Sequence, residues 1–472
     1  MKIKRSVSER AKKENSMDMC SGPLFSKIVR YTLPIIFSGI LQLLYNAADL
    51  VIVGKYAGKT SLAAVGSTGS LTNLIVNLFI GLSVGTGVVV AQSIGAADRD
   101  KIYRTVQTSV TVSVIAGIAV GIFGVIASPQ LLSLMDTPDD VLGLSSLYMR
   151  IYFAGMPANM LYNFGAAILR ADGDTKRPLY FLTVSGLVNI VLNFITVKYM
   201  NMDVAGVAVA TVISQVISAA LVLRALVKGS SNCRFDIRRP AVYRRELSAV
   251  ARVGLPAGLQ GVLFAFSNVL IQSSVNSFGS VAMAGNAASG NIEGFVYTSM
   301  NAVYQTATTF CSQNYGAGNY RRINKILIEC LASVIVIGTV MGYAAYFLGD
   351  KLLSLYNSDP EVIGYGLIRM SVIITTYALC GVMDVLVGAL RGEGYFTMPM
   401  IVSIGVICGM RIVWLYTAFR AFHTLTCLYI SYPVSWLLAV ICHLICWFAV
   451  KPKVKKRLQE RARCSEAESA QA

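Results

Sequence analysis

The stretch from Leu71 to Ala91 reads LTNLIVNLFIGLSVGTGVVVA and contains no charged residue. Its length matches the roughly 20 residues that an α-helix needs to cross the hydrocarbon core of a bilayer. Comparable apolar runs occur at residues 110–127, 204–223 and 330–348. A single run of this kind fits a buried helix of a soluble protein, but their recurrence along the chain indicates a membrane protein with many spans.

The composition of the whole chain agrees with this interpretation. Of the 472 residues, 55% are hydrophobic and 14% are charged, whereas soluble domains carry about 25% charged residues. We therefore predict an all-α membrane protein with twelve transmembrane helices. Their expected limits are 27–53, 62–92, 104–128, 143–168, 178–199, 204–227, 246–277, 281–312, 322–348, 361–390, 397–419 and 424–450.

The basic residues indicate the orientation of these spans. The net charge of +17 does not predict a nucleic-acid partner, because nucleic-acid binders gather basic residues on one folded polar face. Here 31 of the 41 Lys and Arg lie in tails and loops on one side of the predicted membrane, and five lie in loops on the other. Cytoplasmic loops retain positive charge, so we expect both termini to be cytoplasmic and the protein to be a multi-pass protein of the cell membrane.

The two halves of the chain resemble each other. Residues 169–173 read LRADG and residues 390–394 read LRGEG, 221 positions later. The same offset relates LLSL at 131–134 to LLSL at 352–355, and an offset of 222 relates Pro34 to Pro256. Each repeat holds six helices, so both halves enter the membrane from the same side, which is typical of transporters with parallel repeats.

This repeat predicts the domain organisation. The six-helix bundles are expected at residues 27–228 and 246–450, joined by the basic cytoplasmic linker 229–245. Residues 1–26 and 451–472 are expected to be cytoplasmic tails, mobile over residues 1–20 and from about Lys451 onward. A two-lobed single chain suits alternating access around a central cleft, so a monomeric secondary transporter is the predicted class.

Motifs in both halves resemble those of the multidrug and toxic compound extrusion (MATE) family, within the superfamily that includes lipid-linked oligosaccharide flippases. The resemblance runs from about Ile28 to Val450. It rests on these motifs in order: Pro34, Tyr45-Asn46 with Asp49, Gln92 with Gly95-Ala96, Leu169-Arg170 with Gly173-Asp174, Asn189 to Asn193, Ala205-Gly206 to Thr211 and Gln215, Leu390-Arg391-Gly392 with Gly394, Arg411 with Trp414, and Tyr432-Pro433 with Trp436. It implies an antiporter that exports small, amphipathic or cationic organic compounds, driven by a proton or sodium gradient and with no other cofactor.

Asp49 is the strongest candidate for the coupling site. A charged side chain in the middle of a bilayer costs about 2.5–3.5 kcal/mol on insertion scales, and intramembrane acids usually mark functional sites. Asn46 lies on the same helix face, nearly one turn earlier. In the repeat Asn46 aligns with Asn268 but Asp49 aligns with Ile271, so we expect ion coupling in the N-terminal half. The alternative is a structural hydrogen bond between helices.

The resemblance implies further members of this site. Asp49, Asn189, Asn193 and Thr211 match the family's cation site in the N-terminal lobe, and their oxygens are hard ligands suited to a small cation. Tyr148 and Asn163 are implied as members of its hydrogen-bond network. Asn193 stands where relatives often carry aspartate, which leaves sodium and proton coupling both open. No metal is expected beyond a sodium ion at Asp49.

Three other residues carry predictions. Pro34 lies inside the first helix and removes a backbone hydrogen bond there; the resemblance implies that this helix bends at the proline, and a static kink is the alternative. Asp384 and Arg411 are charges in adjacent helices of the second half. We expect them either to pair, which is the less costly state in lipid, or to line the substrate cleft.

Two other functions compete with cation-coupled export. A lipid-linked oligosaccharide flippase needs a large, strongly basic cleft, and the intramembrane arginines are few. A membrane-embedded enzyme needs clustered catalytic residues such as an HExxH pair, and the two histidines, His423 and His443, lie in no such motif. The predicted partners are therefore small-molecule substrates and the lipid bilayer.

Overall fold

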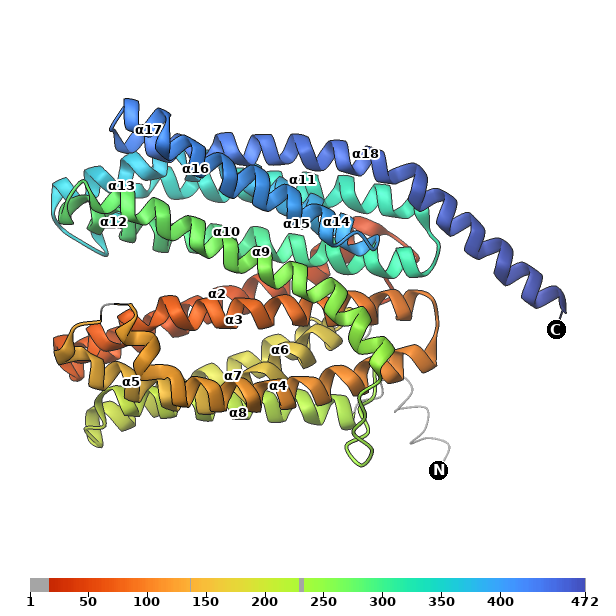
Figure 1. The fold of residues 1–472 in the computed structure, drawn as a ribbon, viewed down its shortest axis with the longest axis horizontal. Coiled ribbons are helices and arrows are strands. Elements are labelled where there is room, and N and C mark those ends of the chain that lie inside the picture. Colours follow the sequence, from red (N-terminus) through yellow and green to blue (C-terminus); the bar gives the residue numbers. More distant parts are fainter. Residues whose placement is uncertain (1–16, 136, 229–232, 472) are drawn as a thin grey trace. The chain divides into compact units, whose positions relative to one another are not determined.

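The computed structural model describes residues 17–135, 137–228 and 233–471, and in this part of the chain every regular element is a helix (Figure 1). Residues 1–16 of the predicted N-terminal tail and residues 229–232 of the predicted linker lie outside the described residues. The chain divides into two compact units. Unit 1 contains Leu33–Gly258 with the described residues up to Asp18, and unit 2 contains Met19–Thr32 and the chain from Leu259 onward.

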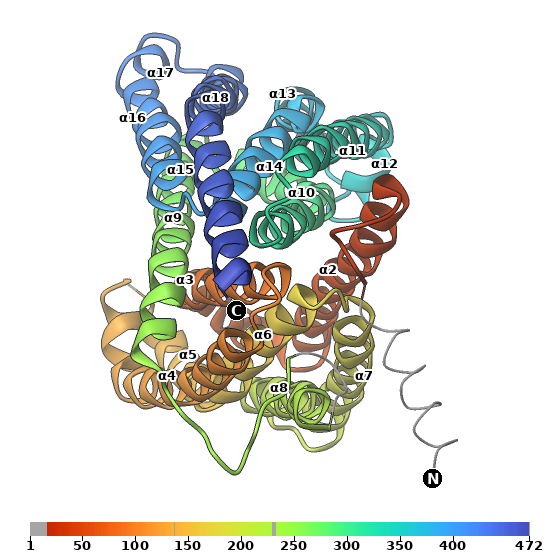
Figure 2. The ribbon, with the colours of Figure 1, turned by 90° about the vertical axis from the view of Figure 1, so that its right-hand side faces the viewer.

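In the first half of the chain, the described residues form seven α-helices and one π-helix. In chain order they are α2 (Leu24–Tyr56), α3 (Gly58–Gly95), α4 (Arg99–Ser133), α5 (Asp139–Ala154), α6 (Met156–Ala171), α7 (Lys176–Asn193), the π-helix η1 (Phe194–Tyr199) and α8 (Asp203–Lys228). Within unit 1, α7 lies beside α8, and α4 packs on both α5 and α6 (Figure 2).

The second half forms longer and more interrupted helices. In chain order they are α9 (Arg244–Asn276), α10 (Ser280–Gly316), α11 (Tyr320–Phe347), α12 (Gly349–Ser354), α13 (Pro360–Val372), the 3₁₀-helix η2 (Ile374–Thr376), α14 (Ala378–Gly392), α15 (Thr397–Val402), the π-helix η3 (Ser403–Cys408), α16 (Gly409–Tyr416), α17 (Ala418–Ala421) and α18 (Leu425–Gln471). Within unit 2, α10 packs against α11, α13 and α14.

These helices form twelve membrane passages in the described part of the chain. Nine are long and apolar enough to span a bilayer by themselves, and α13 with α14, bent by 43°, makes a tenth. The other two passages are the α5–α6 pair, which is interrupted at Gly155, and α10, which carries many polar residues. The predicted all-α fold with twelve transmembrane helices is confirmed.

The two loops of the LRxxG repeat share one backbone conformation. Gly173 has φ +91° and Gly394 has φ +89°, and each follows the last residue of its helix by two positions. A left-handed residue at this place ends a helix, and glycine adopts it without steric cost. The repeat seen in the sequence therefore preserves the same helix-ending turn in both halves.

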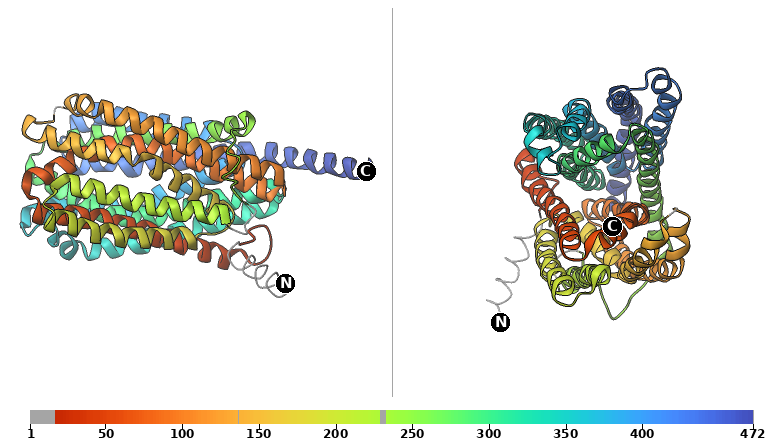
Figure 3. Two further views of the ribbon diagram at one scale, coloured as in Figure 1. Left: turned by 90° about the horizontal axis from the view of Figure 1, so that it is seen from below. Right: turned by 90° about the vertical axis from the view of Figure 1, so that its left-hand side faces the viewer.

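Both tails differ from the prediction in the described residues. Met19 is fully buried, and its carbonyl oxygen accepts hydrogen bonds from Asn314 Nδ2 (3.1 Å) and Arg322 Nε (3.2 Å). At the other end, α18 remains helical to Gln471 and continues past the other unit 2 helices (Figure 3). The helix continues beyond the span because Lys, Arg, Glu and Ala, which are frequent after Lys451, are good helix formers.

In unit 1, α3 and the first part of α9 approach each other closely enough for backbone contact. A Cβ atom added to Gly81 would lie 2.1 Å from the Gly258 nitrogen, and one added to Gly85 would lie 2.5 Å from the Val250 oxygen. Small residues at such crossings let membrane helices pack through their backbones. This contact explains why α9 up to Gly258 belongs to unit 1.

Gly81→Ala is expected to destabilise the protein. The new methyl group would clash with the α9 backbone, which has no flexible end that can move aside. The loss should be about 1–3 kcal/mol, the usual cost of overpacking, measured as a lower thermal unfolding midpoint in detergent. Gly69→Ala on the same helix is the control, because nothing lies within 4 Å of its added Cβ. An unchanged midpoint in Gly81→Ala would contradict the close contact.

Candidate functional site

The candidate coupling site of unit 1 lies where α2 packs on α7. Gly186 on α7 leaves room for the ring of Tyr45, since an added Cβ would lie 1.9 Å from Tyr45 Cε2. The Tyr45 hydroxyl also donates to the Thr183 carbonyl oxygen at 3.5 Å. These contacts bring the C-terminal half of α2, and with it Asp49, against the last turns of α7.

Asp49 heads a chain of polar side chains across three helices. Asn193 Nδ2 donates to Asp49 Oδ1 and also to Asn189 Oδ1, the latter at 3.3 Å. Asn189 Nδ2 in turn lies 3.5 Å from Thr211 Oγ1 on α8. Asn189 and Asn193 face the same way because they are one turn apart on α7. The structure thus joins four of the residues that the sequence assigns to the site.

One buried oxygen among these four side chains has no hydrogen-bond partner in the described residues. Asn193 is fully buried, and its Oδ1 accepts no hydrogen bond from any described residue. An unpaired buried acceptor is costly, so this oxygen is suited to a ligand that the protein does not itself supply. Tyr148, on α5, lies within electrostatic range of Asp49 and stacks on Tyr152.

The other residues predicted for the coupling site make no hydrogen bond to these four side chains. Asn163 Nδ2 donates to the Asn159 carbonyl and side-chain oxygens of its own helix, at 2.9 and 3.0 Å. Asn46 is exposed and makes no hydrogen bond to the described residues. Pro34 lies within the continuous helix α2, where Ser38 Oγ donates to its carbonyl oxygen at 2.7 Å. Bending at Pro34 stays a prediction.

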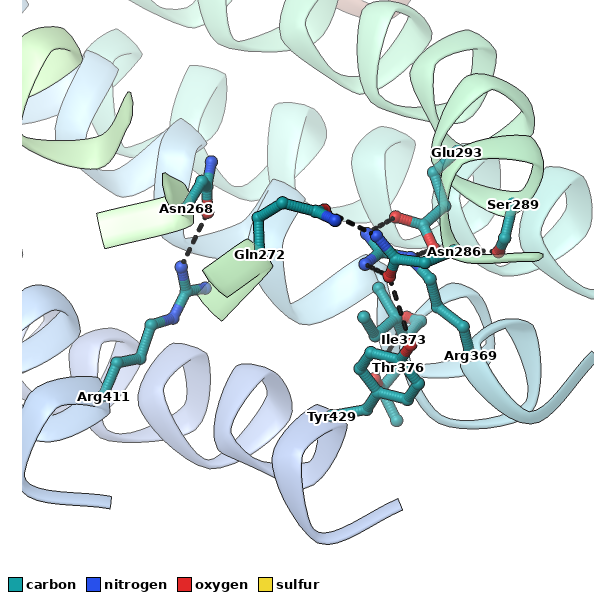
Figure 4. Close-up of polar contacts among 10 residues, drawn as sticks. All are labelled: Asn268, Gln272, Asn286, Ser289, Glu293, Arg369, Ile373, Thr376, Arg411 and Tyr429. Atoms are coloured by element: carbon teal, nitrogen blue, oxygen red, sulfur yellow. Dashed lines mark hydrogen bonds and ion pairs between the residues drawn. The ribbon is translucent and has the colours of Figure 1, made fainter. Parts of the chain in front are cut away.

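Unit 2 contains a buried charge cluster that the sequence did not reveal (Figure 4). Arg369 on α13 makes a bidentate ion pair with Glu293 on α10, through Nε–Oε1 (2.8 Å) and Nη2–Oε2 (2.7 Å). Its Nη1 donates to Asn286 Oδ1 at 2.6 Å, and the Tyr429 hydroxyl donates to the same oxygen at 3.1 Å. Asn286 Nδ2 donates to Gln272 on α9 at 2.8 Å.

This cluster is electrically balanced and ties α9, α10, α13 and α18 together. The sequence does indicate the α10 part of this cluster, because the spacing of Asn286, Ser289 and Glu293 places them on one face of that helix. Arg369 lies 76 residues after Glu293, and helix periodicity alone gave no reason to pair them.

The predicted ion pair between Asp384 and Arg411 is wrong for the described structure. Arg411 instead donates from Nη1 to Asn268 Oδ1 and from Nε to Ser435 Oγ, both at 3.3 Å. The electrostatic neighbours of Asp384 are Arg391 and Tyr297. The two residues do sit in adjacent spans, but the rotation of each helix directs them to different neighbours.

Twelve membrane passages with a hydrogen-bonded series of acid and amide side chains inside one unit are typical of polytopic transporters. The MatE family profile matches the chain twice, over residues 34–195 and 256–417. The chain therefore belongs to the MatE family of multidrug and toxic compound extrusion transporters. The two matches start 222 residues apart, as the internal repeat predicts.

Relatives of known name agree with this assignment. The chain is 27% identical over 389 residues to the "Probable multidrug resistance protein YoeA" of Bacillus subtilis, covering 81% of this chain and 84% of that protein. It is 24% identical to the "FAD transporter" of Shewanella oneidensis, covering 79% and 83%. A solved outward-facing MATE family transporter superposes with a TM-score of 0.87 at 23% identity, covering 94% of this chain and 99% of that one. These relatives are transporters, not enzymes.

Proposed function

We propose that this protein is a cation-coupled antiporter that exports small organic compounds by alternating access, and that Asp49, Asn189, Asn193 and Thr211 bind the coupling cation. The observation that carries the proposal is the hydrogen-bonded series from Asp49 through Asn193 to Asn189, in which the buried Asn193 Oδ1 is left unpaired among the described residues. A carboxylate, amide oxygens and a hydroxyl are hard ligands that suit a sodium ion, and the carboxylate can instead take up a proton.

Antiport links this site to export through a conformational equilibrium. Occupation by the cation and binding of the substrate each favour a different state of the protein, so each changes the affinity for the other. The names of relatives, one for multidrug resistance and one for FAD transport, favour organic compounds as substrates. We further propose a monomer in the cell membrane with both termini cytoplasmic and no nucleic-acid partner.

Ethidium transport into inverted membrane vesicles tests this function. Vesicles that contain the protein are given a proton gradient, a sodium gradient or neither. We expect one of the two gradients to accelerate ethidium uptake, and dissipation of that gradient by an ionophore to return the rate to that of vesicles without the protein. Equal rates with and without both gradients would reject coupled export.

A further inference from the structure

Arg411 is a buried cation with no carboxylate partner. It is 5% exposed and lies on α16, inside a membrane span. Among the described residues no carboxylate forms an ion pair with it; its hydrogen-bond partners are the neutral side chains of Asn268 and Ser435, and its Cζ lies 4.1 Å from the centre of the Tyr432 ring. By contrast, Arg369 in the same unit is fully balanced by Glu293.

An uncompensated guanidinium is costly at this depth. Intramembrane arginines normally pair with an acid or with backbone carbonyl groups, and removing the partner of a buried charge is strongly destabilising. The face of Tyr432 offsets part of the cost by a cation–π interaction. The remaining positive charge can still attract an anion.

Some N–H groups of Arg411 and Asn268 also donate no hydrogen bond to the described residues. A guanidinium has five N–H groups, and Nη2 of Arg411 donates to no described residue. Asn268 directs its oxygen at Arg411, so its amide nitrogen points the other way (Figure 4). Asn268 is exposed, so an anion that reaches its amide group also comes near the positive charge beneath it.

The repeat relates this place to the coupling site of unit 1. Asn268 lies 222 residues after Asn46, and Arg411 lies in the span of unit 2 that corresponds to α7 of unit 1. Unit 1 has an acid near these positions, whereas Asp49 is matched by Ile271 in unit 2. Unit 1 therefore offers a carboxylate and an unpaired oxygen, which suit a cationic ligand. Unit 2 offers the guanidinium of Arg411 and unpaired N–H donors, which suit an anionic one.

We propose that Arg411 and Asn268 form an anion-binding subsite in unit 2, which takes the carboxylate or phosphate group of an organic anion. The guanidinium supplies the charge and a free N–H, and the Asn268 amide supplies a second donor, a combination that suits anionic oxygens. The inference rests on the proposed export function, because it makes anionic compounds one class of its substrates.

Thermal unfolding of the purified protein in detergent, titrated with small aromatic ligands, tests the subsite. Benzoate and phenyl phosphate carry the anionic group, and benzylamine is a cation of similar size. A ligand that binds the folded state raises the unfolding midpoint. We expect both anions to stabilise the wild type. Arg411→Gln should weaken benzoate binding about tenfold or more, as for loss of a charge-assisted hydrogen bond.

Two further variants keep the result interpretable if Arg411→Gln folds poorly. Asn268→Ala alters an exposed side chain and should still weaken benzoate binding by about fivefold, as for loss of one neutral donor. Arg420→Gln, which removes an exposed arginine of the same unit, should leave benzoate binding unchanged. No stabilisation of the wild type by either anion, or equal stabilisation of the wild type, Arg411→Gln and Asn268→Ala, would overturn the proposal.

A lipid headgroup has the same chemistry as a free organic anion. Repeating the titration in phosphatidylcholine nanodiscs, with and without phosphatidylglycerol, separates the two sources. Benzoate binding that is unaffected by phosphatidylglycerol supports a transported anion, and competition between them identifies the subsite as a headgroup site and overturns a substrate role. No gradient is used, so failure here leaves coupling through Asp49 standing, and failure of coupling leaves these titrations valid.

Discussion

Asp49→Asn is expected to abolish gradient-driven ethidium transport while the protein still inserts in the membrane. The substitution keeps the shape of the side chain and its hydrogen bond with Asn193, but it removes the only group of the polar chain that can carry a negative charge. Without that charge the site no longer exchanges a proton or attracts sodium. The rate in inverted vesicles should fall to the background of vesicles without the protein.

Two comparisons show whether the loss is specific to this site. Asn193→Ala removes a neutral ligand and should reduce the rate less than Asp49→Asn does. Asp139→Asn changes an exposed acid outside the polar chain and should transport at the wild-type rate. Wild-type transport by well-expressed Asp49→Asn would show that the coupling ion binds elsewhere, with Asp384 the next candidate.

Arg369→Met is expected to cause the largest loss of stability in unit 2. It leaves the carboxylate of Glu293 buried without its partner, and breaking a buried ion pair from one side costs about 3–5 kcal/mol. The Asn286 oxygen also loses its 2.6 Å donor. The thermal unfolding midpoint in detergent should fall by several degrees or more, and Glu293→Leu should behave in the same way.

The double variant separates the ion pair from general packing. Arg369→Met combined with Glu293→Leu leaves no unpaired charge, so it should recover much of the stability that either single substitution loses. Additive losses in the double variant would show that the two charges do not interact.

The sequence predicted the features that depend on hydrophobic composition and on the internal repeat. Twelve apolar runs and the LRxxG repeat gave the helices and their order, because a bilayer sets the length of each span. Asp49 was found because a carboxylate in an apolar run is costly. The resemblance to known transporters added Asn189, Asn193 and Thr211.

Other features depend on helix rotation, which one sequence does not specify. The ion pair between Glu293 and Arg369 was not predicted, although the two form a 2.7 Å contact. Arg411 was paired with Asp384 because their spans are neighbours, but it turns toward Asn268 and Ser435. The helical end of α18 was missed because charged sequence after a span predicts a tail as readily as a helix.

In the proposed mechanism the coupling cation binds at Asp49, and substrate binding releases it. Cation release from the purified protein on addition of ethidium, followed with a pH indicator in weak buffer and in parallel with radioactive sodium, tests this most directly. We predict that ethidium releases protons or sodium from the wild type and none from Asp49→Asn. Equal release from both proteins, or none from the wild type, would contradict the account.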